Sequence, residues 1–120
     1  MKDVNKLILI GRLGADPTMR ETKSGNKVVN FSLATQRKFK RQGDDSSELE
    51  TETQWHRVVS WGKQAESCAQ YLKKGSTVFV EGLLKSRKYT SNEGVEKTIY
   101  EVHADEVNFL SYPQEQKAAT

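Results

Sequence analysis

The stretch "TQWHRVVSWGKQAESCAQYLKK", residues 53–74, changes the spacing of its side chains halfway along. Over residues 53–62 the side chains alternate in character, which is the period of a β-strand. Over residues 63–74 the apolar side chains recur at intervals of three and four, which is the spacing of one helix face: Ala65, Cys68, Ala69 and Leu72. The sequence therefore predicts a strand followed directly by one helix, which ends at Lys73-Lys74 and Gly75.

Working outward from this junction, the remaining β-prone segments are separated by turns rich in Gly, Ser, Asn and Pro. Counting residues 53–62, five strands are expected, three before the helix and two after it: Asn5–Leu13, Val28–Phe39, Thr53–Gly62, Thr77–Thr90 and Val95–Leu110. A helix between the third and fourth of five strands is what a Greek-key barrel of the OB type requires. A ferredoxin-like fold needs a second helix, for which no segment remains. Gly82 inside the fourth strand indicates a bulge or bend.

The length of 120 residues fits one domain. We expect this domain to span residues 1–110 and to be followed by a short disordered tail over 111–120. No apolar run approaches a membrane span, and the start has no signal-peptide pattern. A single cysteine, Cys68, excludes an internal disulfide, and two distant histidines make a metal site improbable. No cofactor is expected, and a reducing, cytoplasmic setting is the economical interpretation.

Charge is segregated along the chain although the net charge is only +3. Residues 1–41 carry ten basic against three acidic residues, and residues 55–90 carry seven against two. Residues 42–54 carry five acidic residues and no basic ones, and residues 91–120 carry six against two. The polar stretch over residues 41–52 has no periodicity, and we expect it to be an acidic loop. Two basic blocks divided by this loop favour a polyanionic partner, although charge runs are often simply solvated faces.

The strand over residues 53–62 places Trp55, Arg57 and Trp61 on one side. If that side were the core, Arg57 would be a buried and costly charge. If it faces outward, two large exposed rings form a contact surface of the kind on which nucleic-acid bases stack. Both interpretations stay open from this segment alone, because tryptophan is often simply buried.

Two further rings sit among basic residues. Phe39 follows Arg37-Lys38, and Tyr89 follows Arg87-Lys88. Each ring shares its parity with an arginine two residues earlier, so a charge and a ring face the same way. This pattern suits a stacking platform beside a groove that follows a phosphate backbone.

The segments "VNKLILIGRLGADPTMR", "FSLAT", "TQWHRVVSWGKQAE", "YLKKGSTVFVEGLLKSRKYT" and "YEVHADEVNFL" closely resemble the bacterial-type single-stranded DNA-binding protein family, in order from Val4 to Leu110. The resemblance implies an OB barrel, assembled as a homotetramer, that binds single-stranded DNA in replication, recombination and repair. It places the stacking rings at Phe39, Trp55, Trp61 and Tyr89. The phosphate-binding side chains that we expect beside them are Arg37, Arg57, Lys63, Lys85, Arg87 and Lys88.

The resemblance also implies where subunits meet. It places His56 at or near a subunit interface, and it makes the first strand, with Asn5, Leu7 and Leu9, the strand that pairs across a dimer. A histidine satisfied within the barrel is an equally good interpretation of His56 without the family. The family's acidic tip, which recruits replication and repair proteins, has no counterpart in the closing residues 117–120, so recruitment of such partners is not assigned.

Other functions predict other patterns. A nuclease needs clustered carboxylates or histidines, whereas the acids here concentrate in residues 44–52 and 93–106. The sequence therefore predicts a protein that is not an enzyme. A primosomal replication protein of similar fold and an OB module that binds only protein or RNA are the remaining alternatives.

Overall fold

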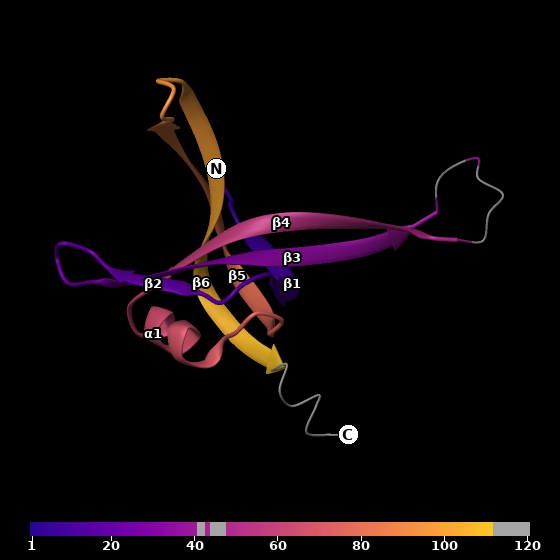
Figure 1. Cartoon of the computed structure of the whole chain (residues 1–120), viewed down its shortest axis with the longest axis horizontal. Helices are drawn as coiled ribbons and strands as arrows, with labels where there is room; N and C mark the ends of the chain where they lie inside the picture. Colours follow the sequence, from indigo (N-terminus) through magenta and orange to yellow (C-terminus); the bar gives the residue numbers. More distant parts are fainter. Residues whose placement is uncertain (41–42, 44–47, 112–120) are drawn as a thin grey trace.

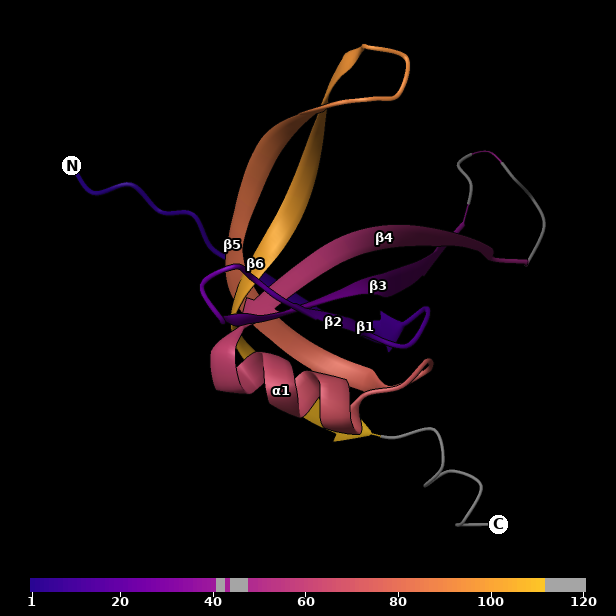
Figure 2. The same ribbon diagram turned by 60° about the vertical axis from the view of Figure 1, so that its left-hand side comes forward.

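Five strands form a closed barrel, and one helix covers its end (Figures 1 and 2). The computed structural model describes residues 1–40, 43 and 48–111. The elements in chain order are β1 (Leu7–Leu13), β2 (Thr18–Glu21), β3 (Lys27–Phe39), β4 (Glu50–Trp61), α1 (Gly62–Tyr71), β5 (Thr77–Thr90) and β6 (Glu96–Ser111).

The barrel closes because β1 pairs on both of its sides. The strands follow the order β1-β5-β6-β4-β3, and β3 pairs back with β1, where Leu13 lies opposite Leu33. All contacts are antiparallel except that between β4 and β6, where Val58 lies opposite Val102. This confirms the predicted OB barrel with its helix between the third and fourth barrel strands. The short segment β2 adds a sixth strand along β3.

The core follows the alternation of the strands. Val29, Phe31 and Leu33 of β3 are buried and face the apolar stripe of α1. The predicted stripe is confirmed, since Ala65, Cys68 and Leu72 are buried and Ala69 packs against them. Burial of each such Val, Leu or Phe side chain stabilises the folded state by about 1.5–3 kcal/mol. Cys68 is part of this core, and burial raises the pKa of its thiol to about 11, so it is a small apolar group at neutral pH.

The helix ends at Tyr71, three residues before the predicted end. The backbone N–H of Lys74 donates instead to the Asp16 carboxylate at 2.8 Å, so a side chain from the β1–β2 loop takes a donor that a longer helix would use. Gly75 has φ +90° and donates to the Leu13 carbonyl at 2.8 Å. The glycine therefore forms a turn that ties the helix exit to β1, and it is not the helix cap.

Two pairs of strands extend beyond the barrel as arms (Figure 1). The β3–β4 pairing continues outward to Phe39 opposite Glu50, so β4 begins three residues before the predicted start of that strand. The β5–β6 pairing continues to Thr90 opposite Glu96. The predicted acidic loop over residues 41–52 is therefore wrong for residues 50–52, while residues 41–42 and 44–47 lie outside the described residues.

The β5–β6 pairing shifts its register between Glu81 and Gly82, which confirms the predicted irregularity. A Cβ on Gly82 would lie 2.1 Å from the His103 carbonyl oxygen, so glycine allows β6 to approach closely. At the chain's end β6 runs to Ser111, and residues 112–120 of the expected tail lie outside the described residues. Within the described part of the chain, no helix has the length and apolar character needed to cross a membrane.

Candidate nucleic-acid interface

The tryptophan side of β4 faces outward. Trp55 and Trp61 are 61% and 42% exposed, whereas Val58 and Ser60 on the other parity are fully buried. Of the two interpretations left open by the sequence, the surface is therefore confirmed and the core is wrong. Val59 shares the outward parity but is buried at the point where β4 pairs with β6.

Trp55 lies against the backbone of Gly14. A Cβ on Gly14 would come within 2.4 Å of the indole Cζ3 atom, so the absence of a side chain makes room for the ring. Next to the ring is an open groove of about 420 Å³ that Arg12 and Gln36 also line. One part of the indole is thus supported by the protein while most of its surface stays accessible, which is the arrangement that stacking requires.

Trp61 is the first member of a chain of contacts across β4, β6 and β5. Its ring centroid lies 4.7 Å from that of His103, with the planes tilted by 55°. His103 Nε2 lies 3.4 Å from Glu101 Oε1, and the same oxygen lies 3.3 Å from Arg87 Nε. Tyr89, 39% exposed, shares the side of β5 on which Arg87 lies.

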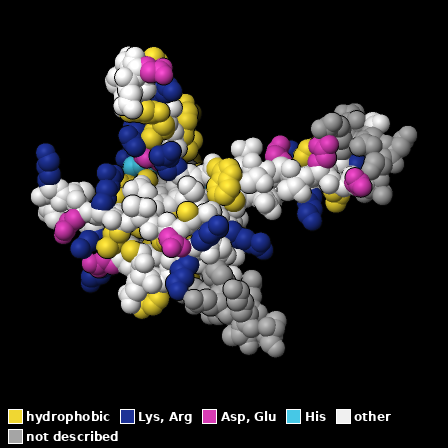
Figure 3. Space-filling view, viewed as in Figure 1, with side chains coloured by type: hydrophobic (Ala, Val, Ile, Leu, Met, Phe, Trp, Pro, Cys, Tyr) yellow, Lys and Arg dark blue, Asp and Glu magenta, His cyan; other side chains and the backbone are white. Residues whose placement is uncertain are grey.

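These side chains form one continuous surface, which we call the aromatic face: Trp55, Arg57, Trp61, Arg87, Tyr89, Glu101 and His103. Its continuity follows from register, because Val59 of β4 lies opposite His103 of β6, and the β5 residues of the same parity pair with β6 residues on that side. Figure 3 shows Lys and Arg side chains gathered where the β5–β6 arm joins the barrel. The sequence reasoning missed Glu101 and His103, although their shared parity next to the buried Val102 is a signal for an outward-facing pair.

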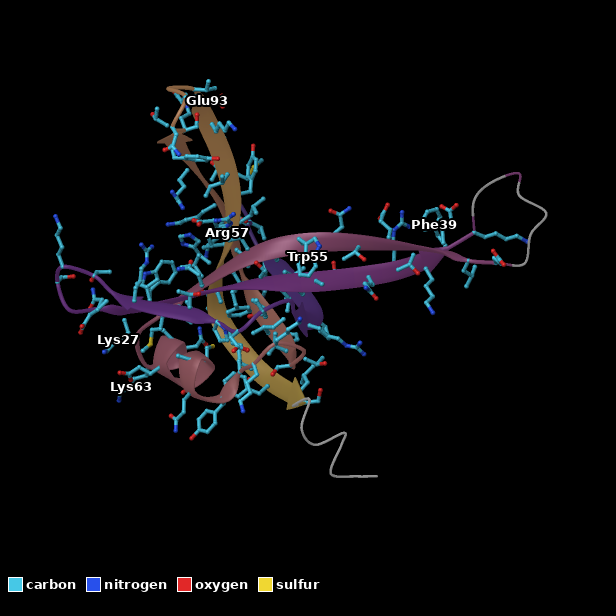
Figure 4. The ribbon with its side chains drawn as sticks, viewed as in Figure 1. Lys27, Phe39, Trp55, Arg57, Lys63 and Glu93 are labelled. Atoms are coloured by element: carbon cyan, nitrogen blue, oxygen red, sulfur yellow. The ribbon has the colours of Figure 1, made fainter. Side chains whose placement is uncertain are left out.

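Phe39 does not lie on the aromatic face. Trp55 is opposite Ala34 in the β3–β4 pairing, and Phe39 is an odd number of residues farther along β3, so it points to the other side of the arm. Figure 4 shows Phe39 near the outer end of the arm and Trp55 closer to the barrel. The expected sharing of one side by Arg37 and Phe39 is confirmed, since the guanidinium carbon lies 5.0 Å from the ring centroid.

The six predicted phosphate-binding side chains divide into two groups. Three of them form ion pairs at the surface: Arg37 with Glu52 at 2.8 Å, Arg87 with Glu101 at 3.3 Å and Lys88 with Glu96 at 3.4 Å. The hydrogen bond from Arg37 lowers the pKa of Glu52 and raises that of the arginine. Within residues 1–40, 43 and 48–111 the other three have no ion-pair partner: Arg57, Lys63 and Lys85.

Position separates the cations further. Lys85 shares the side of β5 with Arg87, while Lys88 has the opposite parity and faces away from the aromatic face. Lys63 lies in the first turn of α1, apart from the two arms (Figure 4). Arg57, between the two tryptophans and without a partner in the described part of the chain, is the cation best placed to meet a phosphate beside a stacked base.

The side chains that the sequence placed at a subunit interface make contacts within their own chain. Leu7 and Leu9 pack against the barrel's own core, and the Asn5 side chain bonds both backbone groups of Leu84, at 2.9 and 3.1 Å. His56 shares a 2.9 Å hydrogen bond with Thr35, and partial burial lowers the pKa of its imidazole. This agrees with the interpretation of His56 as a histidine satisfied within the barrel.

The exposed apolar side chains of β1 are instead Ile8 and Ile10, at 55% and 58%. Sequence reasoning missed them because the run "LILI" is apolar on both parities, so its pattern does not show which side faces the core. Elsewhere in the described residues, no three His, Cys, Asp or Glu side chains are grouped so that they could hold a metal ion.

Known proteins resemble this chain in sequence. The "Single-stranded DNA-binding protein 1" of Chlorobaculum tepidum is 51% identical over 96 residues, which cover 80% of this chain and 57% of that protein. The "Single-stranded DNA-binding protein" of Neisseria meningitidis serogroup A is 43% identical over 107 residues, or 89% of this chain and 60% of that protein. The chain thus spans less than two thirds of the length of these relatives.

A solved structure titled "Plasmodium falciparum SSB complex with ssDNA" superposes with a TM-score of 0.81 at 34% identity, covering 92% of this chain and 98% of that one. The model of the single-strand binding protein family matches residues 4–110, which include both arms, the helix and every residue of the aromatic face. On this match, and on the relatives that agree with it, the chain belongs to the single-strand binding protein family.

Proposed function

We propose that this chain binds single-stranded DNA with little sequence preference, in replication, recombination and repair. The observation that carries the proposal is the aromatic face, on which Trp55, Trp61 and Tyr89 are exposed beside Arg57, whose guanidinium has no ion-pair partner among the described residues. Every base has a π-face, so stacking on these rings tolerates any sequence, while cations neutralise the backbone. The names of the relatives support the same ligand.

In this proposal the four rings do not act as one platform. A strand stacked on Trp55, Trp61 and Tyr89 reaches Phe39 only by passing around the edge of the β3–β4 arm. Phe39 and Arg37 would then contact the DNA beyond that edge, after the Arg37–Glu52 pair exchanges its carboxylate for a phosphate. Lys88 would likewise contact DNA only on the reverse side of the β5–β6 arm.

The test is a titration of the protein's tryptophan fluorescence with an unlabelled oligothymidine at several salt concentrations. We expect strong quenching at saturation and a steep linear fall of log K with log salt. Arg57→Gln should flatten that slope by about 0.7, the contribution of one phosphate contact to a single strand. Lys27→Gln, at a cation that pairs with Glu21 and to which no DNA contact is assigned, is the matched control and should leave the slope nearly unchanged. Unchanged fluorescence at saturating oligonucleotide would contradict stacking.

We further propose that the protein is not an enzyme and acts in the cytoplasm. Incubation of the oligonucleotide with protein and Mg²⁺ should leave it intact, whereas cleavage would favour a nuclease. Competition among single-stranded DNA, duplex DNA and RNA separates this function from that of an RNA- or protein-binding OB module.

We also propose that four chains assemble through β1. The exposed Ile8 and Ile10 support this, as does the edge of β1 that faces away from β5, which pairs with β3 only at Arg12 and Leu13. Open edges and apolar patches of this kind favour association. Light scattering should give four times the chain mass of 13.6 kDa. The double substitution of Ile8 and Ile10 by lysine should lower the mass, and an unchanged mass would exclude this surface.

A further inference from the structure

The aromatic face contains one carboxylate where a polyanion is expected to bind. Glu101 is only 7% exposed, whereas its neighbours Asp105 and Glu106 on β6 are exposed. An acidic group at a DNA-binding surface opposes binding through Coulomb repulsion, and burying a carboxylate is costly unless partners compensate it. Glu101 has two such partners, Arg87 and His103, at 3.3 and 3.4 Å.

These partners link Glu101 to the rings. His103 packs on the Trp61 indole at a centroid distance of 4.7 Å, so the carboxylate supports Trp61 through the imidazole. On its other side Glu101 contacts Arg87 through Nε, and the guanidinium has further N–H donors on its two Nη atoms for a phosphate. Tyr89 lies two residues beyond Arg87 on the same side of β5.

We propose that Glu101 is a positioning residue, which holds Arg87 and His103 so that Trp61 and the adjacent cation are ordered before DNA arrives. A long side chain that is free in the unbound protein must be immobilised on binding, and this lowers affinity. Glu101 orders Arg87 and His103 before binding, so that less conformational entropy is lost when DNA arrives. This gain in affinity exceeds the repulsion between the DNA and the Glu101 carboxylate, because the two partners screen that charge. The inference rests on the proposed binding of single-stranded DNA and deepens it.

The two effects predict opposite signs. If Glu101 were only an unfavourable charge, E101A would tighten the binding of an oligothymidine. As a positioning residue, E101A should weaken binding by about tenfold, the loss expected when one or two side chains must be ordered on binding. E101Q keeps an oxygen acceptor for Arg87 or His103 and should bind within about twofold of the wild type. E106A removes an exposed carboxylate of the same strand, whose only hydrogen-bond partner among the described residues is the Asn108 side chain, and serves as the charge control.

A second measurement does not need DNA. In a Trp55→Phe background Trp61 is the only tryptophan, so its fluorescence anisotropy reports the order of that ring alone. E101A should lower the anisotropy and E106A should not. If the wild type fails to bind DNA, the proposed function is wrong, but the anisotropy still tests the positioning of Trp61.

Equal or tighter binding by folded E101A, or unchanged anisotropy, overturns the inference. If E101A does not fold, E101Q decides: tightening beyond twofold overturns the inference, and binding within twofold supports it.

Discussion

Alanine in place of Trp55 or Trp61 is expected to weaken the binding of single-stranded DNA by about 1–3 kcal/mol for each ring, a range that comes from single-strand-binding proteins themselves and not from this structure. Both rings are exposed on the aromatic face, so removing one loses a stacking surface and leaves the core intact. The two losses should be nearly additive only if the rings hold different bases. Titration of an oligothymidine by anisotropy of a labelled strand measures each loss.

Tyr71→Ala is the control for this experiment. Tyr71 is as exposed as the tryptophans, but it lies on α1 against Phe109, away from the aromatic face. We expect its removal to leave affinity unchanged. Circular dichroism should show each variant folded. If Trp55→Ala or Trp61→Ala unfolds the barrel, the ring contributes to the stability of the fold and its loss of binding cannot be assigned to stacking.

Gly82→Ala is expected to destabilise the barrel by about 1–3 kcal/mol, the usual cost of forcing extra atoms into a packed site. The new Cβ would lie 2.1 Å from the His103 carbonyl oxygen and 2.9 Å from the Ala104 Cα. Both are backbone atoms, so no side chain can swing aside and the β5–β6 pairing must separate locally. The midpoint of urea unfolding measures the loss.

Ser86→Ala is the matched control on the same strand, at an exposed position of the arm. It should leave the midpoint nearly unchanged. A Gly82→Ala midpoint equal to that of the wild type would show that the bulge accommodates a side chain. Because His103 packs on Trp61, the same substitution should also weaken DNA binding, more than its effect on folding alone would explain.

The fold was predictable because its local patterns agree with one another. The change from a period of two to that of a helix at Trp61–Gly62, and the apolar stripe around Cys68, place the helix and fix the class of barrel. The predictions were wrong where contacts between residues distant in sequence determine where an element ends. The helix stops early because Asp16, 58 residues away in sequence, accepts the N–H of Lys74.

The site was predictable as far as the alternation of side chains along one strand shows which residues share a side. Alternation put Trp55, Arg57 and Trp61 on one side, and the exposure of both rings in the structure shows that this side faces outward. Parity within one strand does not relate it to the next, however, so only the β3–β4 register reveals that Phe39 points the other way. The partnership of Glu101 with Arg87 likewise depends on the β5–β6 register, which the sequence does not specify.

The parallel contact between β4 and β6 has a mechanical consequence. It joins only two residue pairs, whereas β3–β4 and β5–β6 are long ladders. On this side of the barrel the two long ladders are therefore joined only by a narrow seam, while β1 joins them on the other side, and Trp61 and His103 stand on either side of the seam. A strand of DNA that stacks on both sides of the seam would limit how far the β3–β4 and β5–β6 ladders can move apart.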